Sequence, residues 1–126
     1  MEVIKIKGTD DTPNVILDAE SNIIEFSGRS LPEDVVTFYA PVIQWIEEYA
    51  KSPNPKTEVI FRLEYFNTAS SKILLDILLK FEDILNEGHE VLIQWYFQED
   101  DEDMEEAGEE YSEIVDIPFE MHSYWG

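Results

Sequence analysis

Residues 58–87 read Glu-Val-Ile-Phe-Arg-Leu-Glu-Tyr-Phe-Asn-Thr-Ala-Ser-Ser-Lys-Ile-Leu-Leu-Asp-Ile-Leu-Leu-Lys-Phe-Glu-Asp-Ile-Leu-Asn-Glu, and this stretch decides the fold. Every second side chain from Val59 to Tyr65 is apolar or aromatic, which is typical of a strand. Beyond Lys72 the apolar residues recur three and four apart, which predicts a helix with one buried stripe. That stripe comprises Leu74, Ile77, Leu78, Phe81 and Leu85.

Short polar side chains gather where this predicted strand passes into the predicted helix: Asn67, Thr68, Ser70 and Ser71. Each can accept a hydrogen bond from the free N–H groups of the first helical turn, so one interpretation is a set of helix caps. The same free amides and the positive end of the helix dipole can also hold a phosphate. Lys72, about one turn into the helix, could point its ammonium towards that phosphate. From the residues alone, both a helix cap and a phosphorylation site stay open.

Before this stretch the sequence predicts three strands and a helix. Alternation predicts strands over residues 3–7, 15–18 and 23–26, and the last two should form a hairpin. Ser30 and Glu33 are spaced as a capping box that opens the helix.

That first helix should run to about Lys51. Pro41 lies inside it and lacks an N–H group, so we expect a kink or a break near Ala40.

After the second helix, residues 89–98 alternate as another strand, and residues 117–121 make a last strand. The aromatic tail that follows, residues 122–125, could be a partner contact, although aromatic ends usually fold back onto the domain. Residues 99–113 are strongly acidic. They resemble a calcium loop, but the glycine needed at the sixth position is Glu106 and Gly108 comes too late. We therefore expect a short helix whose acids complement its dipole.

Strands alternating with helices predict an α/β fold with a mixed sheet. The second face of the central strand mixes Ile60 and Phe66 with Arg62 and Glu64. Such a face indicates that helices pack mainly on one side of the sheet and leave the other partly open.

Length, cysteine content and net charge limit the functions and partners that the chain can have. The 126 residues should form one domain over residues 1–126, and without cysteine its stability must come from packing. A net charge of −21 repels phosphate backbones and anionic lipid heads, so we expect neither a nucleic-acid nor a membrane partner. The sequence shows neither a leader pattern nor an apolar run of the roughly 18 residues that a membrane span needs, which predicts a cytoplasmic protein.

Catalytic patterns are scarce. His89 and His122 each lie at a strand edge without a carboxylate or nucleophile nearby in sequence, and glycine-rich phosphate loops are lacking. We therefore expect no enzyme, no cofactor and no metal. Two alternatives stay open: a metal-dependent or carboxylate enzyme that uses the acidic stretch, and an acidic mimic of nucleic acid.

Several segments together resemble the SiaC family of bacterial regulatory phosphoproteins over nearly the whole chain. They are Gly8-Thr9 with Thr12-Pro13, Ser27-Gly28-Arg29-Ser30 with Pro32-Glu33, Pro41-Val-Ile-Gln-Trp45, and above all Phe66-Asn67-Thr68-Ala69-Ser70-Ser71-Lys72. The family is similar in fold to the STAS domains of anti-sigma-factor antagonists. The resemblance therefore implies a STAS-like sheet with a phosphorylatable hydroxyl at the start of a helix.

The same resemblance implies a switch without catalysis of its own. It implies that Thr68 is phosphorylated by a Ser/Thr protein kinase with a histidine-kinase-like fold, and that a PP2C-type phosphatase removes the phosphate. The unphosphorylated form should then bind and activate a diguanylate cyclase, raising cyclic di-GMP and promoting biofilm formation. By analogy and proximity, Arg29 and Lys72 should steady the phosphate beside Asn67, Ser70 and Ser71.

Overall fold

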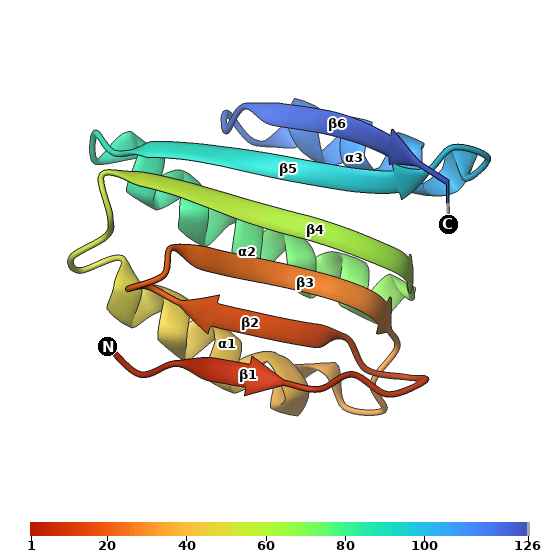
Figure 1. Cartoon of the computed structure of the whole chain (residues 1–126), viewed down its shortest axis with the longest axis horizontal. Coiled ribbons are helices and arrows are strands. Elements are labelled where there is room, and N and C mark those ends of the chain that lie inside the picture. Colours follow the sequence, from red (N-terminus) through yellow and green to blue (C-terminus); the bar gives the residue numbers. More distant parts are fainter. Residues whose placement is uncertain (126) are drawn as a thin grey trace.

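The computed structural model describes residues 1–125 and contains a six-stranded sheet whose strands lie side by side in chain order (Figure 1). The strands are β1 (Ile4–Ile6), β2 (Asn14–Asp18), β3 (Ile23–Ser30), β4 (Lys56–Phe66), β5 (Glu90–Gln98) and β6 (Phe119–Tyr124). The first three strands pair antiparallel, and β3 to β6 pair parallel. The predicted mixed sheet and the hairpin of its second and third strands are confirmed.

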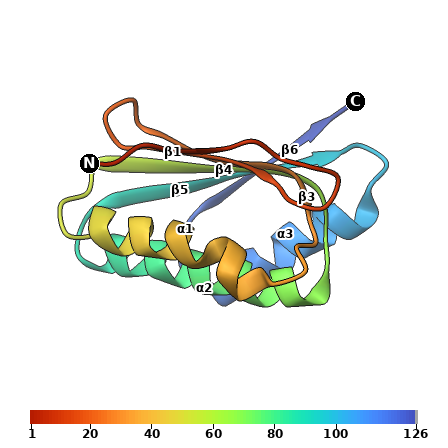
Figure 2. The same ribbon diagram turned by 90° about the horizontal axis from the view of Figure 1, so that it is seen from below.

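Three helices connect the parallel strands: α1 (Val35–Tyr49), α2 (Thr68–Asn86) and α3 (Glu102–Ile114). Each one is a crossover between neighbouring parallel strands, and such crossovers are right-handed. Because all three advance the sheet in the same direction, the helices fall on one face, as Figure 2 shows. The prediction of helices on one side and an open second face is confirmed, except that Phe66, predicted on the second face, packs near Tyr111 of α3 on the helix side.

The core lies between the sheet and the helices. Alternate residues of β4 are buried, including Val59, Phe61 and Leu63, and they meet the stripe of α2 predicted from its spacing. Phe61 stacks on Phe26 of β3 with ring centroids 5.1 Å apart. Burying one such side chain stabilises the fold by about 1.5–3 kcal/mol, so this layer holds the strand-to-helix junction in place.

The predicted capping box is wrong, because Ser30 is the fully buried last residue of β3. Asp34 caps α1 instead, accepting a hydrogen bond from the Thr37 amide. This bond and a second one from the Thr37 hydroxyl hold the pKa of Asp34 below its usual value. β3 extends beyond Phe26, its predicted end, to Ser30, and Gly28, with a φ of 91°, lies where the pairing with β4 shifts register.

The predicted break near Ala40 is also wrong, because α1 runs continuously through Pro41. The proline removes the hydrogen bond to the Thr37 carbonyl. Thr37 and Pro41 are both exposed, so water can satisfy that carbonyl. The alternative outcome, a kink, stays a prediction.

The acidic run forms a helix as expected. Asp101 caps α3 by accepting from the Met104 amide, and three acids occupy its first turn, where they complement the dipole. The last strand, predicted over residues 117–121, is instead β6. His122 and Tyr124 of the aromatic tail therefore belong to the sheet and pack on Tyr96, whereas the side chain of Trp125 is 74% exposed.

Candidate functional site

The first turn of α2 is anchored by Asn67, which lies directly before the helix. Its side-chain oxygen accepts a hydrogen bond from the backbone N–H of Ser70 at 2.8 Å. Its backbone N–H donates to the Ser30 carbonyl at 3.1 Å. The cap interpretation therefore holds for Asn67. Helix geometry leaves the amides of Thr68 and Ala69 without an intrahelical acceptor, so they remain donors for an added anion.

Ser70 is fully buried and belongs to a hydroxyl network with β3 and α1. Its hydroxyl donates to the Ser30 carbonyl at 2.9 Å, and the Ser30 hydroxyl donates to the Ser70 oxygen at 2.9 Å. Because both serine protons are then used, the Tyr39 hydroxyl donates to Ser30, 2.6 Å away. Burial raises the pKa of Tyr39 to about 12, so this proton stays in place at neutral pH. Ser70 therefore fixes the helix start to the sheet.

Thr68 is the exposed hydroxyl of the cluster. Ser71 is half-buried and its hydroxyl donates to the Thr68 carbonyl at 2.7 Å. Lys72 is exposed and lies four residues after Thr68, a spacing that places both side chains on one side of the helix. The structure thus brings together five of the predicted residues: Asn67, Thr68, Ser70, Ser71 and Lys72.

Arg29 lies elsewhere. It neighbours Ser30 on β3, so its side chain projects from the opposite, open face of the sheet. There its Nε donates to the Asp10 carbonyl at 3.1 Å, and its guanidinium lies 5.6 Å from the ring centroid of Tyr65. The structure therefore does not bring Arg29 to the hydroxyl cluster.

A contact that the sequence did not reveal comes from α3. The Tyr111 hydroxyl donates to the Ser71 carbonyl at 2.7 Å, and the ring lies 6.4 Å from that of Phe66. Burial, with a smaller effect from Glu110, raises the pKa of Tyr111. The first turn of α2 is thus held by the hydroxyl network on one side and by α3 on the other.

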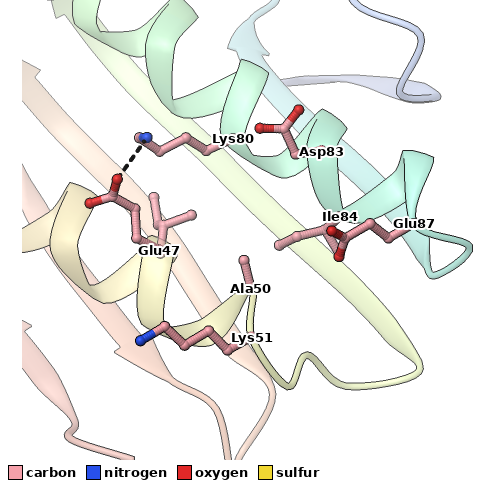
Figure 3. Close-up of a pocket in the computed structure, with 8 residues that line it drawn as sticks. Glu47, Ala50, Lys51, Lys80, Asp83, Ile84 and Glu87 are labelled. Atoms are coloured by element: carbon pink, nitrogen blue, oxygen red, sulfur yellow. Dashed lines mark hydrogen bonds and ion pairs between the residues drawn. The ribbon is translucent and has the colours of Figure 1, made fainter.

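A surface hollow of about 520 Å³ lies between α1 and α2 (Figure 3). Charged side chains of both signs line it, and Lys80 forms an ion pair with Glu47 at 3.2 Å. None of the residues that line the hollow is a cysteine, serine, threonine or histidine, whereas Glu47, Asp83 and Glu87 place carboxylates around it.

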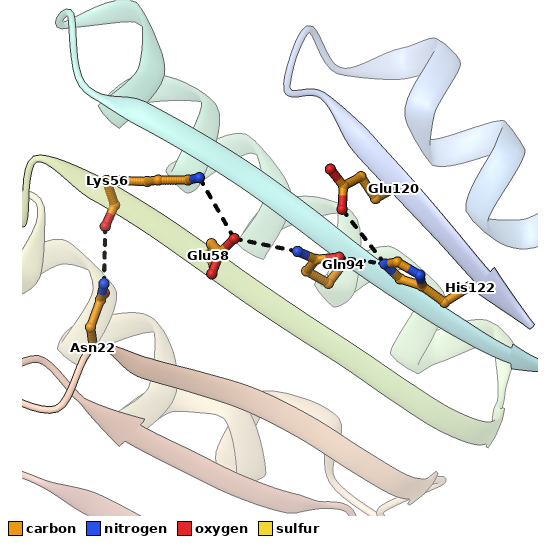
Figure 4. A network of polar contacts seen from close by, with 6 residues as sticks. All are labelled: Asn22, Lys56, Glu58, Gln94, Glu120 and His122. Carbon is orange, nitrogen blue, oxygen red and sulfur yellow. Dashed lines mark hydrogen bonds and ion pairs between the residues drawn. The ribbon is translucent and has the colours of Figure 1, made fainter. Parts of the chain in front are cut away.

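A polar network crosses the open face of the sheet (Figure 4). Glu58 accepts from Gln94 at 3.3 Å, Gln94 contacts His122, and the His122 Nε2 lies 3.7 Å from Glu120. The expectation that His122 has no nearby carboxylate is therefore wrong, and the signal was available because alternate strand residues share a face. Within residues 1–125, no group of three or more histidine and acidic side chains is placed to hold a metal ion.

The fold and the junction define a small α/β domain that presents one exposed hydroxyl at a capped helix start. The model of the SiaC family of regulatory phosphoproteins matches residues 6–124. An uncharacterized protein of Pseudomonas aeruginosa (strain UCBPP-PA14) is 30% identical over 124 residues, which are 98% of this chain and 98% of that protein. This chain therefore belongs to the SiaC family.

Solved structures agree. SiaC of Pseudomonas aeruginosa matches with a TM-score of 0.90 and 29% identity, over 98% of this chain and 100% of that one. A second match, with a TM-score of 0.89 and 30% identity over 96% of this chain and 99% of that one, is the crystal structure of the diguanylate cyclase SiaD in complex with its activator SiaC. Regulation is thus the role of the family. No helix within residues 1–125 is long and apolar enough to span a bilayer.

Proposed function

We propose that this chain is a non-catalytic switch in which phosphorylation of Thr68 controls binding to a diguanylate cyclase. The observation that carries the proposal is the unequal exposure of the three hydroxyls at the junction. Thr68 is exposed, whereas Ser70 is fully buried and Ser71 is half-buried and bonded to the helix backbone. A kinase can therefore reach Thr68 without unfolding the helix start.

The effect of the phosphate follows from charge. It adds about 1.5 to 2 negative charges and three acceptor oxygens. The free amides of the first turn and Lys72, one turn away, can stabilise it on the protein. An effector that covers Thr68 must desolvate those charges, so phosphorylation releases it.

In this proposal the unphosphorylated form binds and activates the cyclase. The complex in which SiaC is the activator of the diguanylate cyclase SiaD supports the choice of partner. Cyclic di-GMP then rises and promotes biofilm formation. A histidine-kinase-like Ser/Thr kinase adds the phosphate and a PP2C-type phosphatase removes it in the cytoplasm, as the family resemblance implies. The chain itself supplies no catalytic group.

Mass spectrometry of the tryptic peptide of residues 63–72 from native cells tests the modification. Cleavage after Arg62 and Lys72 isolates the cluster, and fragment ions separate Thr68 from Ser70 and Ser71. We expect phosphate on Thr68 alone. A peptide that stays unmodified in planktonic and surface-grown cells would leave Thr68 as a helix residue and would remove the switch.

Binding assays test the consequence. The source organism's diguanylate cyclases and Pseudomonas aeruginosa SiaD are purified singly and titrated with the chain. We expect Thr68→Ala to bind like the unmodified protein and Thr68→Asp to lose at least about tenfold in affinity, because a buried charge at an interface costs on the order of 1.4 kcal/mol or more. Ser52→Asp, at an exposed serine in the loop between α1 and β4, is the matched control for added charge. Equal binding by Thr68→Ala and Thr68→Asp contradicts the proposal.

A further inference from the structure

A groove runs between α2 and α3 directly beside the hydroxyl cluster, with a volume of about 240 Å³. Apolar and aromatic side chains form most of it: Phe66, Leu75, Ala107, Tyr111 and Ile114. Ser71, Lys72 and Glu110 complete its lining. Ile114 is 58% exposed although it is a large aliphatic residue, so its side chain gains little from folding.

The floor of the groove is firmly built. The Tyr111 hydroxyl is bonded to the Ser71 carbonyl, and the Tyr111 ring packs near those of Phe66 and Trp95. The groove is therefore a preformed surface feature, and an apolar side chain can enter it without rearranging the helices.

The two rims of the groove differ in charge. Glu110 lines the groove from α3, a helix that carries seven acids and no lysine or arginine: Glu102, Asp103, Glu105, Glu106, Glu109, Glu110 and Glu113. None of the ion pairs within residues 1–125 involves these acids. The α2 rim instead presents Lys72, on the same side of the helix as Thr68.

We propose that this groove anchors the effector, and that its occupant is a segment with a large apolar side chain flanked by lysine or arginine on one side and by a carboxylate on the other. The apolar side chain fills the groove, the basic side faces α3, and the carboxylate pairs with Lys72. Charge complementarity of this kind sets orientation and excludes wrong partners. This inference rests on the proposed function and names the surface through which it acts.

The same geometry explains how a phosphate on Thr68 weakens binding to a partner that is partly basic. The phosphate lies one helical turn from Lys72, so it pairs with that ammonium and withdraws it from the partner. The partner's carboxylate then faces a phosphate at the α2 rim. Lys72 is thus a docking residue in the unmodified protein and a counterion in the phosphorylated one.

The test is a set of affinity measurements with the cyclase that binds the unmodified chain. We expect Ile114→Ala to weaken binding about tenfold, because truncating a central apolar anchor has effects of this size. Leu79→Ala is the matched control, since Leu79 is an exposed leucine on α2 that lines a different hollow. It should bind as the unmodified chain does.

A double-mutant cycle tests the exchange of Lys72. Lys72→Gln should weaken binding severalfold, and Thr68→Asp should then cost clearly less in the Lys72→Gln background than alone, because the withdrawn ammonium is already missing. Circular dichroism of each variant checks that the fold is kept.

The outcomes separate the two proposals. If Thr68→Asp weakens binding but Ile114→Ala and Lys72→Gln do not, the groove is not the docking surface, and the proposed switch stands. If the effects of Thr68→Asp and Lys72→Gln on the free energy of binding are additive, the proposed exchange of Lys72 between partner and phosphate is wrong. If no cyclase binds the unmodified chain, the proposed function fails, and this inference fails with it.

Discussion

Three hydroxyl residues close together in sequence have three different environments. Ser70 is buried in a network with Ser30 and Tyr39, Ser71 is bonded to its own helix, and Thr68 faces solvent. Their chemical types are nearly identical, so exposure alone decides which one an enzyme can modify. At the scale of single residues, burial therefore distinguishes Thr68 as the site of the proposed switch.

Tyr39 provides the first prediction on stability. Tyr39→Phe should lower the free energy of unfolding by about 0.5–1.5 kcal/mol, because the buried Ser30–Ser70 pair loses its donor. Urea unfolding at neutral pH measures this. Tyr65→Phe, at a tyrosine that is 47% exposed, is the control and should change little.

The raised pKa of Tyr39 predicts that the free energy of unfolding depends on pH. Burial raises the pKa of Tyr39 from 10.0 to about 12, so the folded state holds this proton more tightly than the unfolded state. The stabilisation is complete below pH 10 and declines as the pH rises to about 12. Tyr39→Phe should show a shallower decline over that interval, and an unchanged decline would contradict the assigned cause.

At the scale of elements, α3 approaches β5 unusually closely. Gly108 faces Trp95, whose indole N–H donates to the Met104 carbonyl at 3.0 Å. A methyl group on Gly108 would lie 2.5 Å from the nearest indole carbon and 2.8 Å from the Met121 methyl. The glycine therefore lets the helix pack directly on the aromatic ring, which in turn places Tyr111 against α2.

Gly108→Ala should consequently destabilise the protein. Alanine favours a helix over glycine by about 1 kcal/mol, but overpacking a core contact of this kind costs about 1–3 kcal/mol, and at 2.5 Å we expect the clash to dominate. Urea unfolding of Gly108→Ala and of the exposed control Glu109→Ala measures the difference. A Gly108→Ala variant more stable than the parent would show that α3 can move outwards at little cost.

At the scale of the whole molecule, charge opposes folding. The net charge is −21. The ion pairs between Lys51 and Glu48, which are exposed, and between Lys80 and Glu47, of which Lys80 is half-buried, lie at the surface and contribute little. Repulsion among acids therefore outweighs attraction over most of the surface.

Salt should then stabilise the protein. Raising sodium chloride from about 0.01 M to about 0.1 M shortens the screening length from about 30 Å to about 10 Å, and we expect a gain on the order of 1 kcal/mol in the free energy of unfolding. Thermal unfolding at the two concentrations measures it. A variant with Glu102, Glu106 and Glu109 all changed to Gln should gain less stability from added salt. If the parent protein instead loses stability when salt is added, attraction within the ion pairs outweighs the repulsion among acids.

Several features were predictable from sequence because they depend on near neighbours. Alternation in β4 as far as Leu63, the stripe of α2, the acidic helix and the cap at Asn67 each follow from residues within one or two turns. The capping box at Ser30 failed because a cap and the end of a strand look alike locally. Pairing with β4 made Ser30 a strand residue, and the true cap is Asp34.

The sequence by itself determined the order of elements, the α/β class, the acidic surface and the hydroxyl cluster, since periodicity and charge are properties of adjacent residues. Only the tertiary structure decided that Ser70 is buried, that Arg29 lies on the other face, and that α3 forms a groove beside Thr68. The physical reason is that burial depends on contacts distant in the chain. The partners that enclose Ser70 and hold Ser71, which are Ser30 and Tyr111, each lie 40 residues away.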